Sequence, residues 1–295
     1  MGKKIFIGPY EVAGYYSNLA QGFLECGYEC DYITYHPHPY DYGGETRNPI
    51  LIQIARLIEI FRLEKKWPYI PDKILAFILH SVKTAWILKT IIRYDTYIFT
   101  YGQTLTRSHW DLKILRIIGK KVLITYNGSD SRPPYVNGYL RDKQCIKREV
   151  ALHSLREDSL VISIKMREQQ RLGAIIIGNP FSTYQFSSLR FINCLTIGLP
   201  LKIECDNQVK TNYNNQEPIR ILHAPSHPVA KGTHLIRQMI QRLQEKGREI
   251  EYVEITGKAH QEVIDEIKKC DFVIDQVFSD TPLAGFAAEA AWFGK

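Results

Sequence analysis

Short apolar runs alternate with helix-period stretches over the last 77 residues of the chain. The first run, at 219–224, reads Ile-Arg-Ile-Leu-His-Ala and predicts a strand. Around 235–243, apolar side chains recur at the spacing of one helix face, so a helix is expected there. Alternating strands and helices predict a parallel sheet whose ligands sit at the carboxyl ends of its strands. The pattern continues with a strand at 250–255, a helix at 260–269, a strand at 271–275 and an Ala-rich helix after Gly285.

The first 200 residues show the same alternation. The opening strand leads into Gly-Pro-Tyr-Glu-Val-Ala-Gly, which lacks the Gly-x-Gly-x-x-Gly spacing of dinucleotide sites, so no cofactor is predicted. A strand is also expected from 161 to 163 or 165, followed by a polar helix. The other predicted strands are 4–7, 30–35, 95–100, 121–125 and 174–177, and the predicted helices are one that ends near 26 and those at 50–63, 72–93 and 112–119.

The two blocks of alternating elements predict an α/β protein with two Rossmann-like domains. Residues 1–202 form the first domain and 219–295 the second. Residues 203–218 are polar, contain four asparagines and have almost no apolar periodicity, so they are the best linker candidate. Two such domains joined by a hinge are expected to face a deep cleft, which is the usual place for ligands.

Composition narrows the class of protein. A chain of 295 residues with 45% hydrophobic and 23% charged residues is typical of a soluble globular protein. No secretory leader is predicted, and the most apolar stretch, 74–92, carries a histidine and two lysines. Six scattered cysteines without a Cys-x-x-Cys pair indicate reduced thiols, and therefore a cytoplasmic protein.

The net charge of +7 is unevenly distributed. Residues 51–150 contain 18 Lys and Arg against 8 Asp and Glu, whereas 201–295 contain 12 against 14. A basic middle segment could contact anionic lipid headgroups or nucleic acid, or could simply be a solvated helix face. Nucleic acid is not expected as a partner, because no nucleic-acid module is present and the basic residues stand at helical spacing between leucines and isoleucines.

Three pieces of the second block resemble the C-terminal domain of retaining GT-B glycosyltransferases, the group that includes glycosyltransferase family 4. They are residues 221–226 with Lys231-Gly232-Thr233, residues 270–276, and the run from Gly285 to Lys295. In the first block, the strand that ends in Gly-Ser-Asp-x-Arg at 128–132 is similar to the N-terminal domain of that family. The family motif at 289–295 is normally continued by Pro-Val, so the second domain is expected to be C-terminally incomplete in this chain.

The resemblance assigns a role at the leaving diphosphate to Lys231. Its charge, together with the backbone N–H groups of a helix start, would stabilise the anion. The family usually has an arginine just upstream, where this chain has Ser226, His227 and Pro228. His227 is therefore either a replacement phosphate ligand or an ordinary loop histidine. His223 ends an apolar strand and is expected to be a packed core residue.

The resemblance also implies groups for the nucleotide and the sugar. Glu289, expected at the start of a helix, would accept hydrogen bonds from both ribose hydroxyls, although it could instead merely cap that helix. Gly285 would let the backbone approach the diphosphate closely. The family's second carboxylate falls on Thr281, so the neighbouring Asp280 is a candidate for contacting sugar hydroxyls.

Two candidates lie in the first block. Asn127 stands where many relatives have a sugar-contacting histidine; it can donate and accept hydrogen bonds but cannot titrate. Gly14 stands at the N-terminal end of the first predicted helix. It either shapes the cleft beside the donor phosphates or is a turn glycine with positive φ.

These features together predict a retaining, metal-independent hexosyltransferase. No metal is expected, because the chain has no Asp-x-Asp pair. The donor would be a UDP- or GDP-linked sugar and the acceptor a glycan or a lipid-linked molecule, with peripheral contact to the anionic inner face of a membrane. The alternatives are a nucleotide-sugar epimerase and a degenerate, non-catalytic GT-B binding module.

Overall fold

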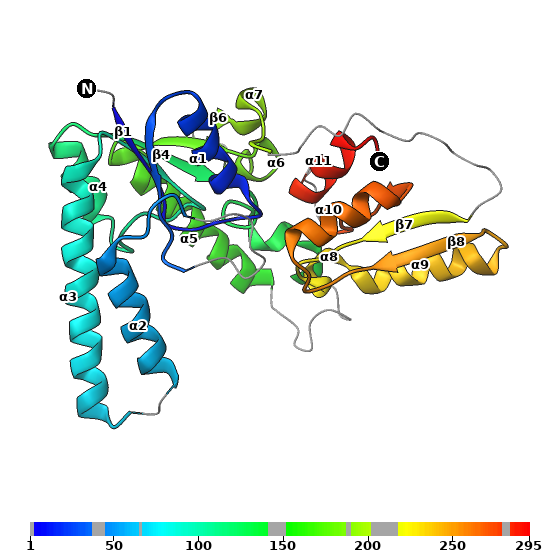
Figure 1. The fold of residues 1–295 in the computed structure, drawn as a ribbon, viewed down its shortest axis with the longest axis horizontal. Coiled ribbons are helices and arrows are strands. Elements are labelled where there is room, and N and C mark those ends of the chain that lie inside the picture. Colours follow the sequence, from blue (N-terminus) through cyan, green and yellow to red (C-terminus); the bar gives the residue numbers. More distant parts are fainter. Residues whose placement is uncertain are drawn as a thin grey trace.

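The computed structural model describes residues 3–36, 45–64, 67–140, 152–186, 190–201, 218–278 and 284–295. Within these residues the fold is α/β, as predicted, and contains two parallel sheets that occupy opposite ends of the molecule (Figure 1). One sheet has six strands and the other has three. The predicted linker, 203–218, lies outside the described residues except for Pro218.

The larger sheet has the strand order β2-β1-β3-β4-β5-β6, and every neighbouring pair is parallel. Its strands are β1 (Lys4–Gly8), β2 (Glu29–Tyr32), β3 (Thr96–Phe99), β4 (Lys121–Tyr126), β5 (Ile175–Gly178) and β6 (Ile192–Asn193). Its helices are α1 (Tyr15–Glu25), α2 (Ile50–Glu64), α3 (Tyr69–Arg93), α4 (Trp110–Ile117), α5 (Leu152–Arg171) and the short α6 (Pro180–Thr183) and α7 (Cys194–Ile197). Two 3₁₀ turns, Pro134–Val136 and Gly138–Leu140, follow β4.

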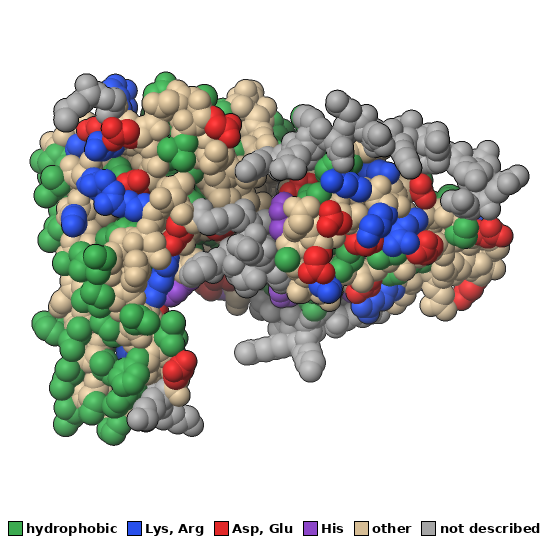
Figure 2. All heavy atoms as spheres, viewed as in Figure 1, with side chains coloured by type: hydrophobic (Ala, Val, Ile, Leu, Met, Phe, Trp, Pro, Cys, Tyr) green, Lys and Arg blue, Asp and Glu red, His purple; other side chains and the backbone are tan. Residues whose placement is uncertain are grey.

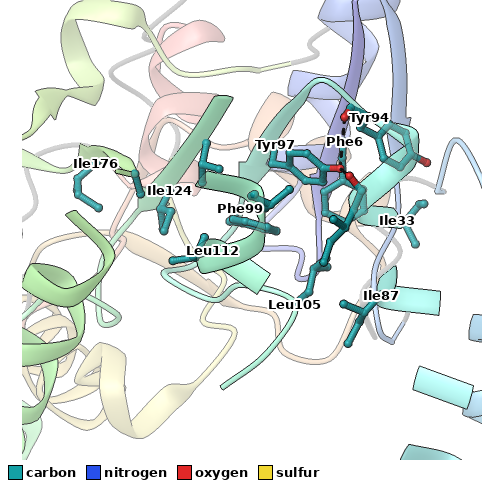
Figure 3. Close-up of a cluster of buried hydrophobic side chains, with 14 of the residues drawn as sticks. Phe6, Ile33, Ile87, Tyr94, Tyr97, Phe99, Leu105, Leu112, Ile124 and Ile176 are labelled. Carbon is teal, nitrogen blue, oxygen red and sulfur yellow. Dashed lines mark hydrogen bonds between the residues drawn. The ribbon is translucent and has the colours of Figure 1, made fainter. Parts of the chain in front are cut away.

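An aromatic cluster forms the core of this part of the molecule (Figure 3). Phe6 on β1 is fully buried, and its ring lies 5.5 Å from Tyr94, 5.8 Å from Tyr97 and 6.1 Å from Phe99. The central strands of a parallel sheet are covered on both faces, so their side chains are apolar on either side of the sheet. The continuous apolar runs seen in the sequence have this origin.

The smaller sheet has the order β8-β7-β9, with both pairs parallel. Leu222, Ile267, Ala290 and Phe293 are buried in its core. The predicted elements are all present, with the third strand shorter than expected. The strands are β7 (Ile219–His223), β8 (Ile250–Glu254) and β9 (Phe272–Val273), and the helices are α8 (Pro228–Lys231), α9 (Thr233–Glu245), α10 (His260–Lys269) and α11 (Gly285–Trp292).

The strand predicted at 161–165 is wrong, because these residues lie within α5. The buried face of α5 is mixed: Ser159, Ser163 and Gln169 are buried there together with Leu155 and Met166. Gln169 accepts a hydrogen bond of 2.6 Å from the Tyr126 hydroxyl and donates to the Gly102 carbonyl oxygen at 3.1 Å. Apolar residues of the same helix, such as Val161, face solvent instead. Apolar periodicity therefore marks the inner face of this helix only in part.

Helices α2 and α3 form an antiparallel hairpin that projects away from the larger sheet (Figure 1). Near its C-terminal end, α3 packs Trp86, Ile87 and Ile91 into the aromatic core. By length and composition alone, α3 is the one helix among the described residues that could cross a membrane, and 28% of its apolar window is buried.

Candidate functional site

A pocket of about 550 Å³ is lined by residues from the segments of both sheets. Val12 and Ala13 follow β1, and Asn127 follows β4. Ala224 follows β7 and Asp275 lies shortly after β9. These are the carboxyl ends of parallel strands, the edge at which α/β proteins place their ligands. The pocket is therefore the first candidate for a binding site in the described part of the chain.

Most of the site residues predicted from the sequence meet at this pocket. Gly14 is not among the lining residues, and Asp280 lies outside the described residues, as does Thr281. The six that line the pocket are Asn127, Ser226, His227, Lys231, Gly285 and Glu289.

Lys231 is held at the pocket wall by an acidic partner that the sequence analysis did not identify. Its Nζ lies 2.7 Å from Asp275 Oδ1, and the two side chains are 20% and 14% exposed. Lys231 ends α8, and Gly232 follows with φ of 73°, a backbone conformation that favours glycine, before α9 begins. Lys231 therefore directly precedes the turn into α9, and its ammonium group is paired with a carboxylate.

Glu289 also has a partner that the sequence analysis missed. Its Oε1 lies 2.7 Å from Nε2 of His260, the first residue of α10. Glu289 is the fifth residue of α11 and not a residue of its first turn, so the expected stabilisation by the helix start does not apply to its carboxylate. The buried carboxylate is oriented by the imidazole ring instead.

His223 at the end of β7 and His227 in the loop after it differ in their surroundings. His223 is fully buried, with Nδ1 2.7 Å from the Ile274 carbonyl oxygen and Nε2 2.9 Å from Thr233 Oγ1. Burial lowers the pKa of His223, so its ring is a neutral part of the core, as expected. His227 is exposed and caps the start of α8, where its Nδ1 accepts the Ala230 N–H at 3.2 Å. Although they are four residues apart, the two rings therefore do not form a metal pair.

A buried carboxylate shapes the loop that carries Asn127. Asp130 accepts hydrogen bonds from the backbone N–H groups of Asn127, at 3.1 Å, and Gly128, at 2.7 Å. Burial raises the pKa of Asp130 to about 6, even though these N–H groups oppose the shift. The carboxylate fixes the backbone from which Asn127 reaches the pocket wall.

The titration of Asp130 is expected to make stability depend on pH. Its native pKa of about 6 exceeds the ordinary value of 3.8, so its contribution to stability is full below about pH 3.8 and is lost as the pH rises through 6. Asp130→Asn cannot titrate at this position, so it does not share this loss. Its unfolding free energy minus that of the unsubstituted protein should therefore rise by up to about 3 kcal/mol between pH 4 and 7. Urea denaturation across this range measures the difference, and parallel pH profiles would contradict it.

The amino end of α1 already holds an anion from the chain itself. The Glu11 carboxylate accepts N–H groups of Val12, Tyr16 and Ser17 at 2.7, 3.1 and 2.9 Å. Gly14 has φ of 77°, in agreement with the turn-glycine alternative. A donor phosphate at this helix end would have to displace Glu11, so the diphosphate is better sought on the other wall of the pocket.

Two further cations line the pocket. Arg132 donates from Nη1 to Asn137 Oδ1 at 3.4 Å, and Lys258 lies 3.1 Å from Glu262. Arg132 belongs to the Gly-Ser-Asp-x-Arg run, so the sequence contained a signal for it, whereas none marked Lys258 or His260. With Lys231, these residues make the lining rich in groups that bind anions.

Among the described residues, no group of three or more His, Cys, Asp or Glu side chains could hold a metal ion. Comparison of the whole chain with protein-family models and with curated protein sequences found no match to either. The geometry of the pocket is therefore the principal guide to its chemistry.

Proposed function

We propose that this protein is a retaining, metal-independent glycosyltransferase of GT-B type, with the pocket as its donor site between two Rossmann-like domains. It would move a hexose from a nucleotide diphosphate sugar to a glycan or a lipid-linked acceptor. The observation that carries the proposal is the meeting of Lys231, Gly285 and Glu289 in one pocket at the carboxyl ends of parallel strands. In the sequence, these residues carry the family resemblance and extend over 59 positions.

The diphosphate would bind between Lys231 and the start of α11. Ala284 precedes this helix and has no side chain that can cap it, so the first N–H groups of α11 are directed to acceptors outside the helix. Gly285 at that position leaves room for a phosphate close to the backbone. Arg132, from the opposite wall, would supply the guanidinium group that the family usually places upstream of the lysine.

The ribose would bind to Glu289. A carboxylate can accept hydrogen bonds from two neighbouring hydroxyls, and His260 would hold the Glu289 carboxylate in the orientation that this requires. On the opposite wall, Asn127 would donate to or accept from a sugar hydroxyl without taking part in proton transfer.

The chemical step would need no nucleophile from the protein. The bond between the anomeric carbon and the leaving phosphate oxygen breaks, and a bond forms to the acceptor oxygen on the same face of the sugar. The acceptor proton passes to the leaving phosphate. Lys231, Arg132 and the start of α11 would stabilise the negative charge that develops on the diphosphate, which is the largest contribution that such a site can make.

Calorimetric titration with UDP, GDP and ADP tests the donor site directly. We expect saturable binding of one nucleotide diphosphate, reduced by Arg132→Ala because one phosphate contact is lost, and unchanged by Arg242→Ala, which removes an arginine outside the pocket lining. Incubation of the matching nucleotide sugar with candidate acceptors then tests transfer. Nucleotide binding without transfer or donor hydrolysis would favour a non-catalytic binding module, and a folded protein that binds none of the three would contradict the proposal.

A further inference from the structure

The hairpin of α2 and α3 exposes a large apolar surface that neither sheet covers. Figure 2 shows hydrophobic side chains gathered over its projecting part. Leu57, Leu63 and Phe77 are 67%, 80% and 71% exposed. We call this surface the hairpin face. Its exposed hydrophobic residues are Ile50, Ile54, Leu57, Ile60, Phe61, Leu63, Tyr69, Ile70, Ile74, Phe77 and Ile78.

Each helix of the hairpin carries apolar residues on two sides. On α2, Ile52 and Ala55 are buried, whereas exposed residues recur from Ile50 to Phe61 at helical spacing. On α3, Leu79 is buried, whereas Ile70, Ile74, Phe77 and Ile78 form an exposed stripe. A helix that serves only to pack against its neighbour needs one apolar side. The second side therefore has a binding role, because a contiguous exposed apolar patch of this kind marks an interaction surface.

The charges of the hairpin suit an anionic partner. Residues 50–93 contain 8 Lys and Arg against 3 Asp and Glu. Two of the three acids are paired within the hairpin, Asp72 with Arg62 at 2.6 Å and Glu59 with Lys83 at 2.9 Å. Two of the arginines pair with acids outside the segment, so the positive excess that remains is carried mainly by the lysines.

Aromatic side chains gather at the end of the hairpin that is farthest from the sheet. The rings of Phe61 and Trp67 lie 4.9 Å apart, and Lys73 Nζ lies 5.2 Å from the Tyr69 ring. Tryptophan and tyrosine next to basic residues favour the boundary between lipid headgroups and acyl chains, because each ring has an apolar body and a polar edge.

We propose that the hairpin face binds the surface of a membrane that contains anionic lipids. Apolar side chains enter the boundary layer while the lysines and arginines contact the headgroups. The hairpin lies on the bilayer and does not cross it. The C-terminal end of α3 packs into the aromatic core, and α3 leads directly to β3, so crossing would pull Trp86 and Ile91 out of that core. The inference does not depend on the chemistry of the pocket.

Sedimentation of the full chain with lipid vesicles tests the proposal. The vesicles contain phosphatidylcholine alone or a mixture with phosphatidylglycerol. We expect binding to the mixed vesicles that weakens with added salt, and much weaker binding to phosphatidylcholine. The double variant Leu57→Glu, Phe77→Glu should lower the partition coefficient about tenfold or more, because it removes two apolar contacts and adds repulsion.

Met239→Glu is the matched control, because it places the same charge on an exposed apolar position of α9. It should leave vesicle binding unchanged. Thermal unfolding and nucleotide titration of the double variant separate a loss of membrane binding from a loss of folding or of the donor site. Vesicle binding that the double variant retains would overturn the proposal. A dimer in light scattering that the double variant dissociates, without vesicle binding, would also overturn it and would assign the hairpin face to a second copy of the chain.

Discussion

Lys231→Ala is expected to lower kcat for sugar transfer by about 10²- to 10³-fold, the usual cost of removing one group that stabilises a developing anion. The ammonium group lines the pocket and would meet the diphosphate as charge builds up on the leaving oxygen. Because this charge is greatest in the transition state, kcat should fall more than donor affinity. Initial rates at saturating donor and acceptor measure the effect.

Because Lys231 pairs with Asp275, the Lys231→Ala experiment needs two controls. Removing Lys231 leaves a largely buried carboxylate without its cation, so Lys231→Ala should also unfold at a lower temperature. Lys4→Ala removes a lysine outside the pocket lining whose partner, Glu29, is exposed, and its kcat should stay within a few-fold of that of the unsubstituted protein. A folded Lys231→Ala variant with nearly normal kcat would remove this residue from the chemical step.

Glu289→Ala is expected to raise the dissociation constant of the nucleotide about a hundredfold or more. In the proposed site the substitution would remove the acceptor of two ribose hydroxyls, and hydrogen bonds to charged groups contribute about 1.5–3 kcal/mol each. It also leaves His260 without the carboxylate that now lies 2.7 Å from its Nε2. Titration calorimetry with the nucleotide that the unsubstituted protein binds gives the ratio directly.

Glu289→Gln separates binding from a purely structural role. The amide keeps the size of the side chain and one acceptor oxygen, so in a binding role it should weaken the nucleotide complex while thermal stability changes little. If Glu289 only supports α11, the same variant should lose stability and keep its nucleotide affinity. Glu262→Gln, at an exposed carboxylate of α10, is the matched control and should change neither property.

The helices and strands followed from the sequence wherever apolar periodicity reflects burial. The helix predicted at 260–269 is α10 as observed, because the side chains on one face of it pack against the smaller sheet. The same argument failed at α5, where hydrogen bonds of Gln169 are buried and valine and isoleucine side chains face solvent. A pattern of residue types is a poor guide to a helix that buries polar side chains beside apolar ones and exposes apolar side chains to solvent.

The residues of the candidate site were likewise predicted only in part from the sequence. Lys231, Gly285 and Glu289 could be chosen because they stand in short runs with recognisable spacing. Their partners could not, since Asp275 lies 44 residues from Lys231 and His260 lies 29 residues from Glu289. These pairs exist only because parallel strands bring distant loops to one edge of a sheet. The Glu11 carboxylate at the amino end of α1 was likewise not predicted, because Glu11 stands four residues before the helix, outside the positions that the capping rules cover.

The strand order of the larger sheet determines when the hairpin acquires its support during synthesis. Strand β1 pairs with β3 on one side, yet Ile5 and its partner Thr96 are 91 residues apart, and α2 and α3 lie between them. At about 5–20 residues per second, a ribosome adds β3 some 5–18 s after β1. Local helix pairs form in far less time than that. Arg93 ends α3 only three residues before Thr96 begins β3, so the whole hairpin precedes the closing strand by about 0.15–0.6 s, which is still long enough for the two helices to pair before the sheet can close.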